Sequence, residues 1–293
     1  MVARLVDHLY AKAPSGLLYH YTGYQALLSI VHSSELWATD LHYFNDSSEL
    51  RHAAEMLAGA ASVVITEGTF PVELVEQLKA WLLQRLADGH MLFVTSFSED
   101  GNLLSQWRGY TPHGNGVSLG FKPEFLLACA SVQNFKLGQC IYDQNEQLSF
   151  GKQAVRALLS HAMSQGPAPA NETHPSQSYF PRFFEQEFAL LSVAALFKHP
   201  AFSAEREWRA VSSVSPSYVT SPARYRAGRT TLIPYKPFVL SLRADDKLQL
   251  AQVFLGPTPE NNLAMGALAK FLAASGVSPT GGIRASLLPY RET

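Results

Sequence analysis

The sequence predicts an α+β protein whose central sheet is mixed or largely antiparallel. Segments with the apolar period of a helix alternate irregularly with short apolar segments that suit strands, and no internal repeat is found. The stretch 164–178 contains three prolines and no apolar period, which is typical of a loop. We therefore expect a single domain over 1–293, with a helical insertion at about 46–90 and a flexible surface loop at about 164–178.

The first half of the chain supplies strands and helices in turn. Leu17, Leu18 and Tyr19 suit a half-buried strand, and a helix is expected next because apolar residues recur at helical spacing from Leu27 to Val31. Asp46 or Ser47 is the expected N-cap of the following helix. The sequence then predicts helices over 46–62 and 71–88, a strand over 91–100, a short helix or turn over 103–110 and a strand over 117–121.

The second half continues with the same mixture of elements. A strand around 135–142 and a helix around 146–164 precede the proline-containing loop, and an aromatic-rich helix at 179–198 follows the loop. The remaining expected elements are strands at 205–214, 231–242 and 252–256, a helix at 258–274 and a short strand at 282–288.

The composition is that of a globular protein. Of 293 residues, 47% are hydrophobic and 16% are charged, and a net charge of −1 argues against long-range attraction of the whole chain to nucleic acid or to an anionic membrane. Cys129 and Cys140 lie in apolar surroundings, which favours buried thiols in a reducing compartment. No signal peptide and no apolar stretch of membrane-spanning length is seen, so we expect a cytoplasmic protein with no membrane partner.

Two short polar segments come first among the candidate sites. His20, Tyr21 and Thr22 end the first strand, where an imidazole and a phenol could line the mouth of a cleft; a backbone-bonded histidine beside a half-buried tyrosine is the alternative. Ser96 and Ser98 share one face of a strand. Their hydroxyls could bind a ribose, or they could mark a solvated edge.

Two charged segments complete the candidates. Arg108 beside Trp107 could hold an anion, because a guanidinium is planar and always charged, or it could stack on the indole. In a strand, Glu205, Glu207 and Arg209 would share one face. That face could be solvated and cross-paired, or it could carry a catalytic carboxylate whose pKa a neighbouring carboxylate raises.

Common cofactor motifs are absent. The chain has no P-loop, no G-x-G-x-x-G and no G-x-S-x-G, and no Cys or His spacing supports zinc. We therefore predict no resident metal.

The motifs together resemble an uncharacterised bacterial domain family of unknown function. The resemblance covers most of 17–256. It is carried by YHYT (19–22), LWATD (36–40), YFND (43–46) with Glu49, SFSED (96–100), LSQWRGY (104–110) and KHPAFSAEREWR (198–209).

The order of a His-Tyr strand, a Ser-x-Ser strand and a glutamate strand also resembles the ADP-ribosyltransferase superfamily. That resemblance implies a split, mostly antiparallel sheet that binds NAD as a substrate. It implies that His20 holds the adenosine-side ribose, that Tyr21 or another aromatic stacks near nicotinamide, and that Ser96 and Ser98 support the nicotinamide ribose. Glu207, or Glu205, would bind the ribose 2′-hydroxyl, and Arg108 would meet the pyrophosphate.

The function implied is an NAD-dependent ADP-ribosyltransferase, such as a toxin or a phage-defence effector, that modifies protein or nucleic acid. A fixed carboxylate would stabilise the oxocarbenium character that develops when the nicotinamide–ribose bond breaks. The basic run Arg224, Arg226 and Arg229 could contact a nucleic-acid phosphate, although a solvated loop is its commoner meaning.

Two other functions stay open. One is a metal-dependent hydrolase or nuclease that uses Glu205, Glu207 and Asp46. The other is a non-catalytic sensor that binds a nucleotide or a protein.

Overall fold

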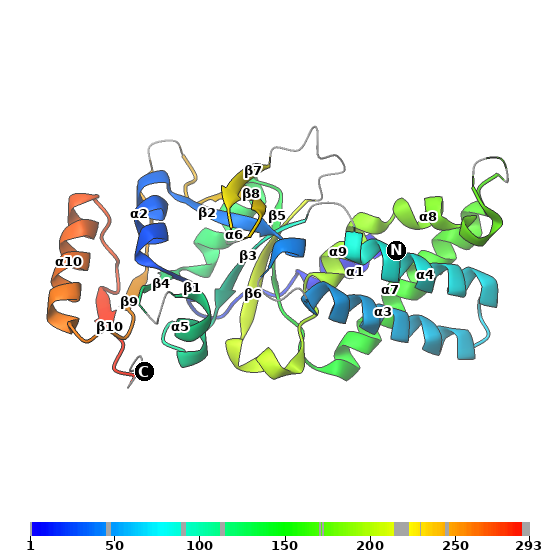
Figure 1. The fold of residues 1–293 in the computed structure, drawn as a ribbon, viewed down its shortest axis with the longest axis horizontal. Coiled ribbons are helices and arrows are strands. Elements are labelled where there is room, and N and C mark those ends of the chain that lie inside the picture. Colours follow the sequence, from blue (N-terminus) through cyan, green and yellow to red (C-terminus); the bar gives the residue numbers. More distant parts are fainter. Residues whose placement is uncertain are drawn as a thin grey trace.

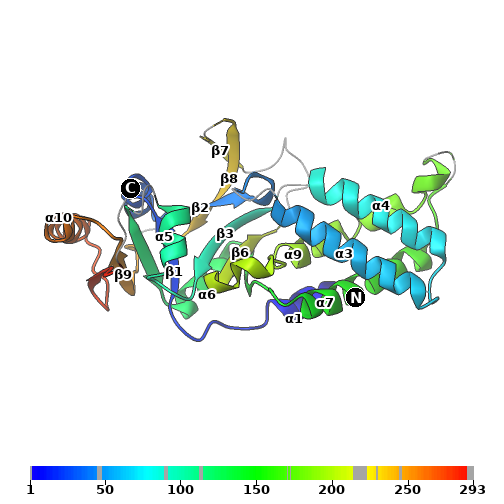
Figure 2. The same cartoon turned by 60° about the horizontal axis from the view of Figure 1, so that its bottom comes forward.

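The computed structural model describes residues 2–44, 48–88, 92–111, 115–169, 171, 173–213, 223–228, 230–243 and 246–288. Within these residues a sheet occupies the middle of an elongated molecule, with a group of helices at one end and a single helix at the other (Figures 1 and 2).

The described residues form a ten-stranded sheet that is mixed and mostly antiparallel. Its main order is β10-β9-β4-β1-β3-β2-β8-β7, with β6 joined to β3 and β5 joined to β6; β9 and β10 pair in parallel. The strands are β1 (Leu18–Thr22), β2 (Glu35–Asp40), β3 (Phe93–Ser98), β4 (Val117–Phe121), β5 (Phe135–Gln139), β6 (Glu207–Ser212), β7 (Arg224–Ala227), β8 (Leu232–Val239), β9 (Gln252–Leu255) and β10 (Ile283–Ala285).

The helices fall into two groups. A helical bundle packs beside β3 and β6 and contains α1 (Val2–Leu9), α3 (Ser48–Thr66), α4 (Val72–Asp88), α7 (Gln144–Gln165), α8 (Phe180–Phe184) and α9 (Glu187–Ala194). The other helices lie along the sheet and are α2 (Tyr24–Ser33), α5 (Leu104–Tyr110), α6 (Pro123–Val132) and α10 (Asn261–Ala274) (Figure 1).

Local sequence explains several element boundaries. α6 begins with Pro123, which has no N–H to lose at the first helical position. Asp143 caps α7, because its carboxylate accepts a hydrogen bond from the N–H of Glu146 at 2.8 Å. α7 ends at Gly166, whose φ of +72° is a left-handed value that glycine adopts without strain.

The core lies on both faces of the sheet because side chains alternate along each strand. Phe97 of β3 and Trp208 of β6 belong to a hydrophobic cluster shared with α2, α6 and α10. Val94 and Val211, from the same two strands, belong to the other cluster, which the helical bundle completes. Ser96 and Ser98 therefore share the face of Val94.

The predicted α+β class with a mixed, mostly antiparallel sheet is confirmed. Most elements begin and end within a few residues of the expected positions, but the aromatic-rich helix expected at 179–198 divides into α8 and α9. The sequence analysis did not predict α1, β2, α6 or β7. α3 and α4 fall in the predicted helical insertion and pack with α7. Gln77 of α4 donates a hydrogen bond to the carbonyl of Pro175, which lies in the predicted loop at 164–178.

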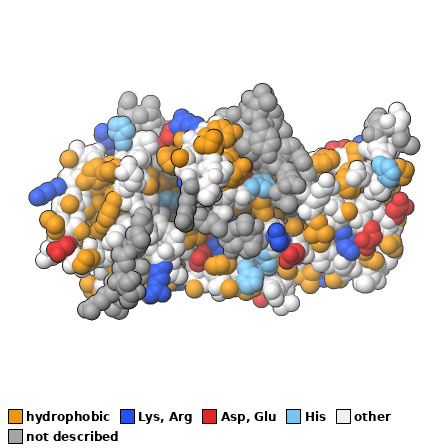
Figure 3. Space-filling view, in the orientation of Figure 1, with side chains coloured by type: hydrophobic (Ala, Val, Ile, Leu, Met, Phe, Trp, Pro, Cys, Tyr) orange, Lys and Arg blue, Asp and Glu red, His pale blue; other side chains and the backbone are white. Residues whose placement is uncertain are grey.

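Other general expectations concern burial and charge. Cys129 and Cys140 are buried, and no disulfide joins them. Among the described residues, every helix is too short or too polar to cross a membrane. Acidic and basic side chains are interspersed on the face shown in Figure 3.

Candidate functional site

The sheet is split beside β3. One edge of β3 pairs with β6 from Val94 to Ser98. The other edge pairs with β1 only at Ser98, opposite Tyr19, and with β2 only at Phe93 and Val94. β1 and β2 thus diverge between these points, and the backbone of 95–97 borders the gap.

His20 of β1 fills part of this gap. Its Nδ1 lies 3.0 Å from the carbonyl oxygen of Ser96, and since a carbonyl can only accept, Nδ1 carries the proton. Burial lowers the pKa of His20 more than this hydrogen bond raises it, so the ring is neutral at pH 7. In a neutral ring protonated at Nδ1, Nε2 is a hydrogen-bond acceptor.

Two cavities meet at His20. The small chamber, about 50 Å³, is lined by Tyr19, His20, Tyr21, Ser96, Phe97, Gln106, Tyr110, Glu205 and Glu207. The large chamber, about 520 Å³, lies between α2 and β2 and includes Thr22, Gln25, Glu35, Trp37, Thr39, Thr95 and Arg226 in its lining. Both chambers share His20, Ser96 and Tyr110, so we treat them as one cleft.

Glu207 is a buried carboxylate held by two cations. Arg209 donates from Nε to Oε1 at 2.8 Å, and Lys198 bonds to Oε2. Burial alone would raise the pKa of Glu207, but the charges and hydrogen bonds of Arg209 and Lys198 outweigh burial and hold that pKa well below its usual range. Glu207 is therefore ionised at neutral pH.

Glu205 lies in a different local structure from Glu207. It ends the 3₁₀ helix Pro200–Glu205, and Arg206, in the left-handed region at φ +44°, separates it from β6. The expected strand over 205–214 thus begins only at Glu207. Glu205 still lines the small chamber, with one oxygen 2.8 Å from Lys198 Nζ. Within the described part of the chain, Lys198, Arg209, Glu205 and Glu207 therefore form a compact cluster of two cations and two carboxylates.

The two predicted serines have different surroundings. Ser96 lines both chambers, and its hydroxyl has no hydrogen-bond partner among the described residues. Ser98 is buried opposite Glu207 in the β3–β6 pair and lines neither chamber. Its hydroxyl donates to the carbonyl of Glu205 at 2.8 Å and accepts from the N–H of Asp100 at 3.1 Å. Ser98 thus positions the chain that carries Glu205.

Tyr21 and Thr22 line different parts of the cleft. The hydroxyl of Tyr21 donates to the carbonyl of Asp100 at 2.6 Å and accepts from the N–H of Leu103 at 2.8 Å, which anchors the turn before α5. Its ring stands edge-on to Trp107, with ring centroids 4.7 Å apart. Tyr21 lines the small chamber and Thr22 the large one.

Arg108 lies apart from the other predicted residues. It is exposed and lines neither chamber, whereas Gln106 and Tyr110 of the same helix face the small one. The structure therefore brings together His20, Tyr21, Thr22, Ser96, Glu205 and Glu207 in one cleft, places Ser98 behind it, and leaves Arg108 outside it.

Residues named for a metal-dependent site are only partly described. Asp46, named for that site, lies outside the described residues. So do Asn45 of the YFND motif, Ser47, the other expected N-cap, and the side chain of Glu49. The residues that are described contain no group of three or more His, Cys, Asp and Glu side chains that could hold a metal ion. Glu205 and Glu207 contact Lys198 instead, so cationic side chains occupy the positions that a divalent ion would need.

Sequence reasoning assigned no role in the cleft to Lys198, Trp37, Thr95 or Arg226. Lys198 and Trp37 fall inside the quoted motifs, which is the only signal that could have drawn attention to them. Their contacts come from elements distant in the chain, so spacing alone does not reveal them.

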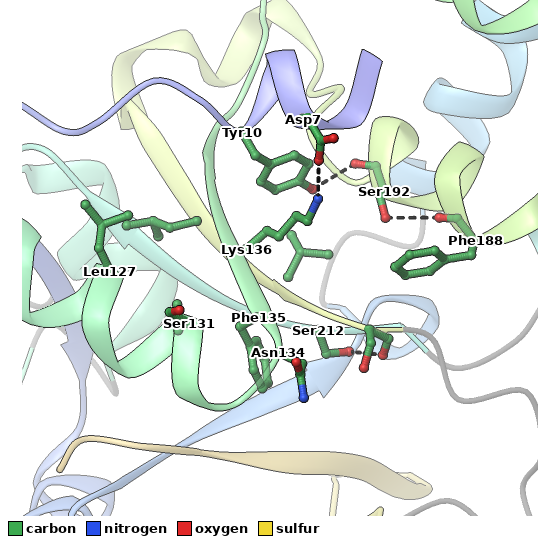
Figure 4. Close-up of a pocket in the computed structure, with 14 residues that line it drawn as sticks. Asp7, Tyr10, Leu127, Ser131, Asn134, Phe135, Lys136, Phe188, Ser192 and Ser212 are labelled. Atoms are coloured by element: carbon green, nitrogen blue, oxygen red, sulfur yellow. Dashed lines mark hydrogen bonds and ion pairs between the residues drawn. The ribbon is translucent and has the colours of Figure 1, made fainter. Parts of the chain in front are cut away.

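Another cavity, of about 560 Å³, lies between α1, α6, β5 and α9 (Figure 4). None of the site residues predicted from the sequence lines it. Its polar side chains bond to nearby groups: Lys136 pairs with Asp7 at 2.7 Å, and Tyr10 donates to the carbonyl of Ser192 at 2.8 Å. Although this cavity is slightly larger, the convergence of titratable and hydroxyl groups favours the cleft as the functional site.

Comparison with known proteins adds one finding. Residues 106–210 match the family model described as "Protein of unknown function (DUF2971)". The match covers less than half of the chain and runs from α5 into β6, so it includes Glu205 and Glu207 but neither His20 nor Ser96. No curated protein and no solved structure gives a significant match.

Proposed function

We propose that the protein binds NAD in the cleft and transfers its ADP-ribose group to an acceptor, on an ADP-ribosyltransferase-like fold. The observation that carries the proposal is the small chamber: His20, Ser96 and the two glutamates come from three distant segments and line one cavity. The split of the sheet beside β3 supports the fold. The large chamber has the volume of a typical small-molecule site, roughly 300–1,000 Å³.

The reaction needs groups of the kinds that line the small chamber. The bond between nicotinamide and C1′ of the ribose breaks, nicotinamide leaves with the bonding electrons, and positive charge develops on the ribose. The nucleophile of the acceptor then bonds to C1′ and releases a proton. A carboxylate beside the 2′-hydroxyl stabilises that charge, while neutral His20 can accept a hydrogen bond from a ribose hydroxyl through Nε2.

Glu205 suits the contact with the reacting ribose better than Glu207. The side chain of Glu205 is 12% exposed, twice the 6% of Glu207, and both oxygens of Glu207 already accept hydrogen bonds from Arg209. In this assignment Glu205 is the catalytic carboxylate, and the Lys198–Glu207–Arg209 group positions it.

The test measures NAD binding by isothermal titration and nicotinamide release by chromatography. We expect wild type to bind and consume NAD. Glu205→Gln should bind NAD within a few-fold of wild type but lose at least about 100-fold in the rate of nicotinamide release, since it removes the charge that favours the transition state. His20→Asn keeps an amide donor for the carbonyl of Ser96 but removes Nε2, so it should weaken NAD binding while the fold persists.

A second function is a nucleotide-binding sensor without catalysis. It is favoured because Lys198 and Arg209 already bind the carboxylate of Glu207. It predicts that NAD binds and remains intact through prolonged incubation. Failure of NAD to bind wild-type protein would remove the transferase. Equal rates of nicotinamide release from wild type and Glu205→Gln would contradict the role of Glu205.

A further inference from the structure

Arg226 of β7 lines the large chamber, and its guanidinium keeps a hydrogen-bond donor without an acceptor in the described part of the chain. Its Nη2 donates to Thr39 Oγ1 at 3.3 Å, and its Cζ lies 5.9 Å from the ring centroid of Trp37. Its Nε is buried and has no hydrogen-bond partner among the described residues. Within the same residues no carboxylate pairs with Arg226, and burial lowers its pKa, so the protein leaves this cation poorly compensated.

Among the described residues Thr95 also carries an unpartnered hydroxyl, but strand register places it on the opposite face of the sheet from Arg226. The residue is 3% exposed, and its hydroxyl has no partner within the described part of the chain. Thr95 belongs to β3 and Arg226 to β7, yet both line the large chamber. Buried polar groups in native proteins are almost always satisfied, so the unpartnered Nε of Arg226 indicates a ligand with acceptor oxygens on its own face of the sheet.

Trp37 gives the same chamber an aromatic surface. Its side chain is well exposed for a tryptophan, at 43%, and Tyr235 packs against it with ring centroids 4.8 Å apart. An indole held in place beside a guanidinium can stack on a planar base while the arginine binds the adjoining phosphate.

Charge distribution separates Arg226 from its neighbour Arg224. Glu35 is the acidic residue among the described lining of the large chamber, and Arg224 pairs with it at 3.2 Å. Arg224 does not line the chamber. Among the described residues that line the cavity, Arg226 therefore carries the positive charge that is available to an anion.

We propose that Arg226 binds the phosphate of a nucleotide in the large chamber, with Trp37 against its base. The inference rests on the proposed function in taking this nucleotide to be part of the same NAD molecule. It assigns the pyrophosphate to Arg226 in place of Arg108, which lies outside both chambers. An indole beside a guanidinium suits a ligand in which a planar base is joined to a phosphate or a diphosphate.

Isothermal titration of the full chain with matched ligands tests the assignment. ADP-ribose and ADP carry a diphosphate, adenosine and nicotinamide riboside carry none, and inorganic pyrophosphate carries no base. Arg226→Gln should weaken ADP-ribose and ADP about tenfold or more, because charge-assisted hydrogen bonds are lost, and should change adenosine and nicotinamide riboside less than twofold. Arg226→Lys keeps the charge but not the planar fork, so its affinity for ADP-ribose should lie between those of wild type and Arg226→Gln.

Two further variants keep the test sharp. Arg108→Gln removes the same charge from a residue outside both chambers and should bind ADP-ribose as wild type does. Thr95→Val keeps the shape and removes a hydroxyl that has no partner among the described residues and lies on the opposite face of the sheet, so it should fold and bind ADP-ribose as wild type does. Arg226→Lys decides the matter if Arg226→Gln fails to fold.

The outcomes separate this inference from the proposed function. If ADP and pyrophosphate bind through Arg226 but NAD neither binds nor reacts, the phosphate subsite stands and the proposed function fails. If NAD binds and Arg226→Gln binds ADP-ribose as tightly as wild type, the subsite is wrong and the proposed function stands. Equal weakening of adenosine and ADP-ribose, or no binding of any phosphate ligand to wild type, would also overturn the subsite.

Discussion

His20 occupies the position where a neighbouring strand would otherwise donate a hydrogen bond to the carbonyl of Ser96. The imidazole satisfies an edge carbonyl at the split and keeps Nε2 as an acceptor. Ser98 likewise holds the backbone of Glu205, and Tyr21 holds the turn before α5. At the scale of single residues, the cleft thus depends on side chains that form hydrogen bonds with backbone groups where the strands diverge.

The buried cluster of Lys198, Arg209, Glu205 and Glu207 predicts a pH-dependent stability. Glu207→Gln leaves two buried cations undercompensated, so the free energy of unfolding at pH 7 should fall by about 3–5 kcal/mol. The folded protein lowers the pKa of Glu207, so the carboxylate stabilises the fold fully above the unfolded pKa near 4.5. This contribution is lost as the pH falls through the folded-state pKa.

Urea denaturation of both proteins across a pH series measures this effect. The difference between wild type and Glu207→Gln should shrink once the pH drops below the ordinary carboxyl range. A difference that stays constant through that range contradicts the account. Glu67→Gln is the matched control, since Glu67 pairs with Arg156 at the exposed surface and its loss should leave the unfolding midpoint unchanged.

At the scale of elements, strong local patterns were predictable and short or interrupted elements were not. The strand at 117–121 was predicted with its exact bounds because a Gly-Asn-Gly turn precedes its apolar or small residues, and all five are buried. β2 escaped prediction because it is short and directly follows a helix. The strand predicted from 205 begins at Glu207, since alternation of charge with tryptophan does not reveal the left-handed residue Arg206.

The junction of β1 and β4 allows an element-scale prediction. Gly116 enters β4 so close to β1 that an added Cβ would lie 2.3 Å from the backbone oxygen of Thr22 and 2.9 Å from Cγ2 of Thr111. Because a backbone atom cannot rotate away, Gly116→Ala should destabilise the protein by about 1–3 kcal/mol.

Gly109→Ala is the control for this change. Gly109 lies in α5 and an added Cβ meets nothing within 4 Å, so alanine should be neutral or stabilise the helix by up to about 1 kcal/mol. Denaturation midpoints measure both variants. Equal effects of the two substitutions would contradict the close approach of β4 to β1.

For the whole molecule, the α+β class and the mixed sheet followed from the order of local patterns. The arrangement of the cleft was only partly predictable. The motifs named His20, Ser96, Glu205 and Glu207, whose side chains share one chamber. Lys198 needed the structure, because its contact with Glu207 depends on pairing that no local pattern encodes. The sequence named Arg226 only within a basic run that could contact a nucleic-acid phosphate, and its place beside Trp37 came from the structure. Arg108 was predicted from its motif to bind an anion, but it lies outside the cleft.

The central claim is that the split beside β3 is a nucleotide site. A crystal structure of the protein soaked with ADP-ribose tests it most directly. We predict electron density between α2 and β2, with a ribose within hydrogen-bonding distance of His20 and the diphosphate at Arg226. Density confined to the cavity between α1, α6, β5 and α9, or a cleft that stays without ligand at saturating ADP-ribose, would contradict the claim.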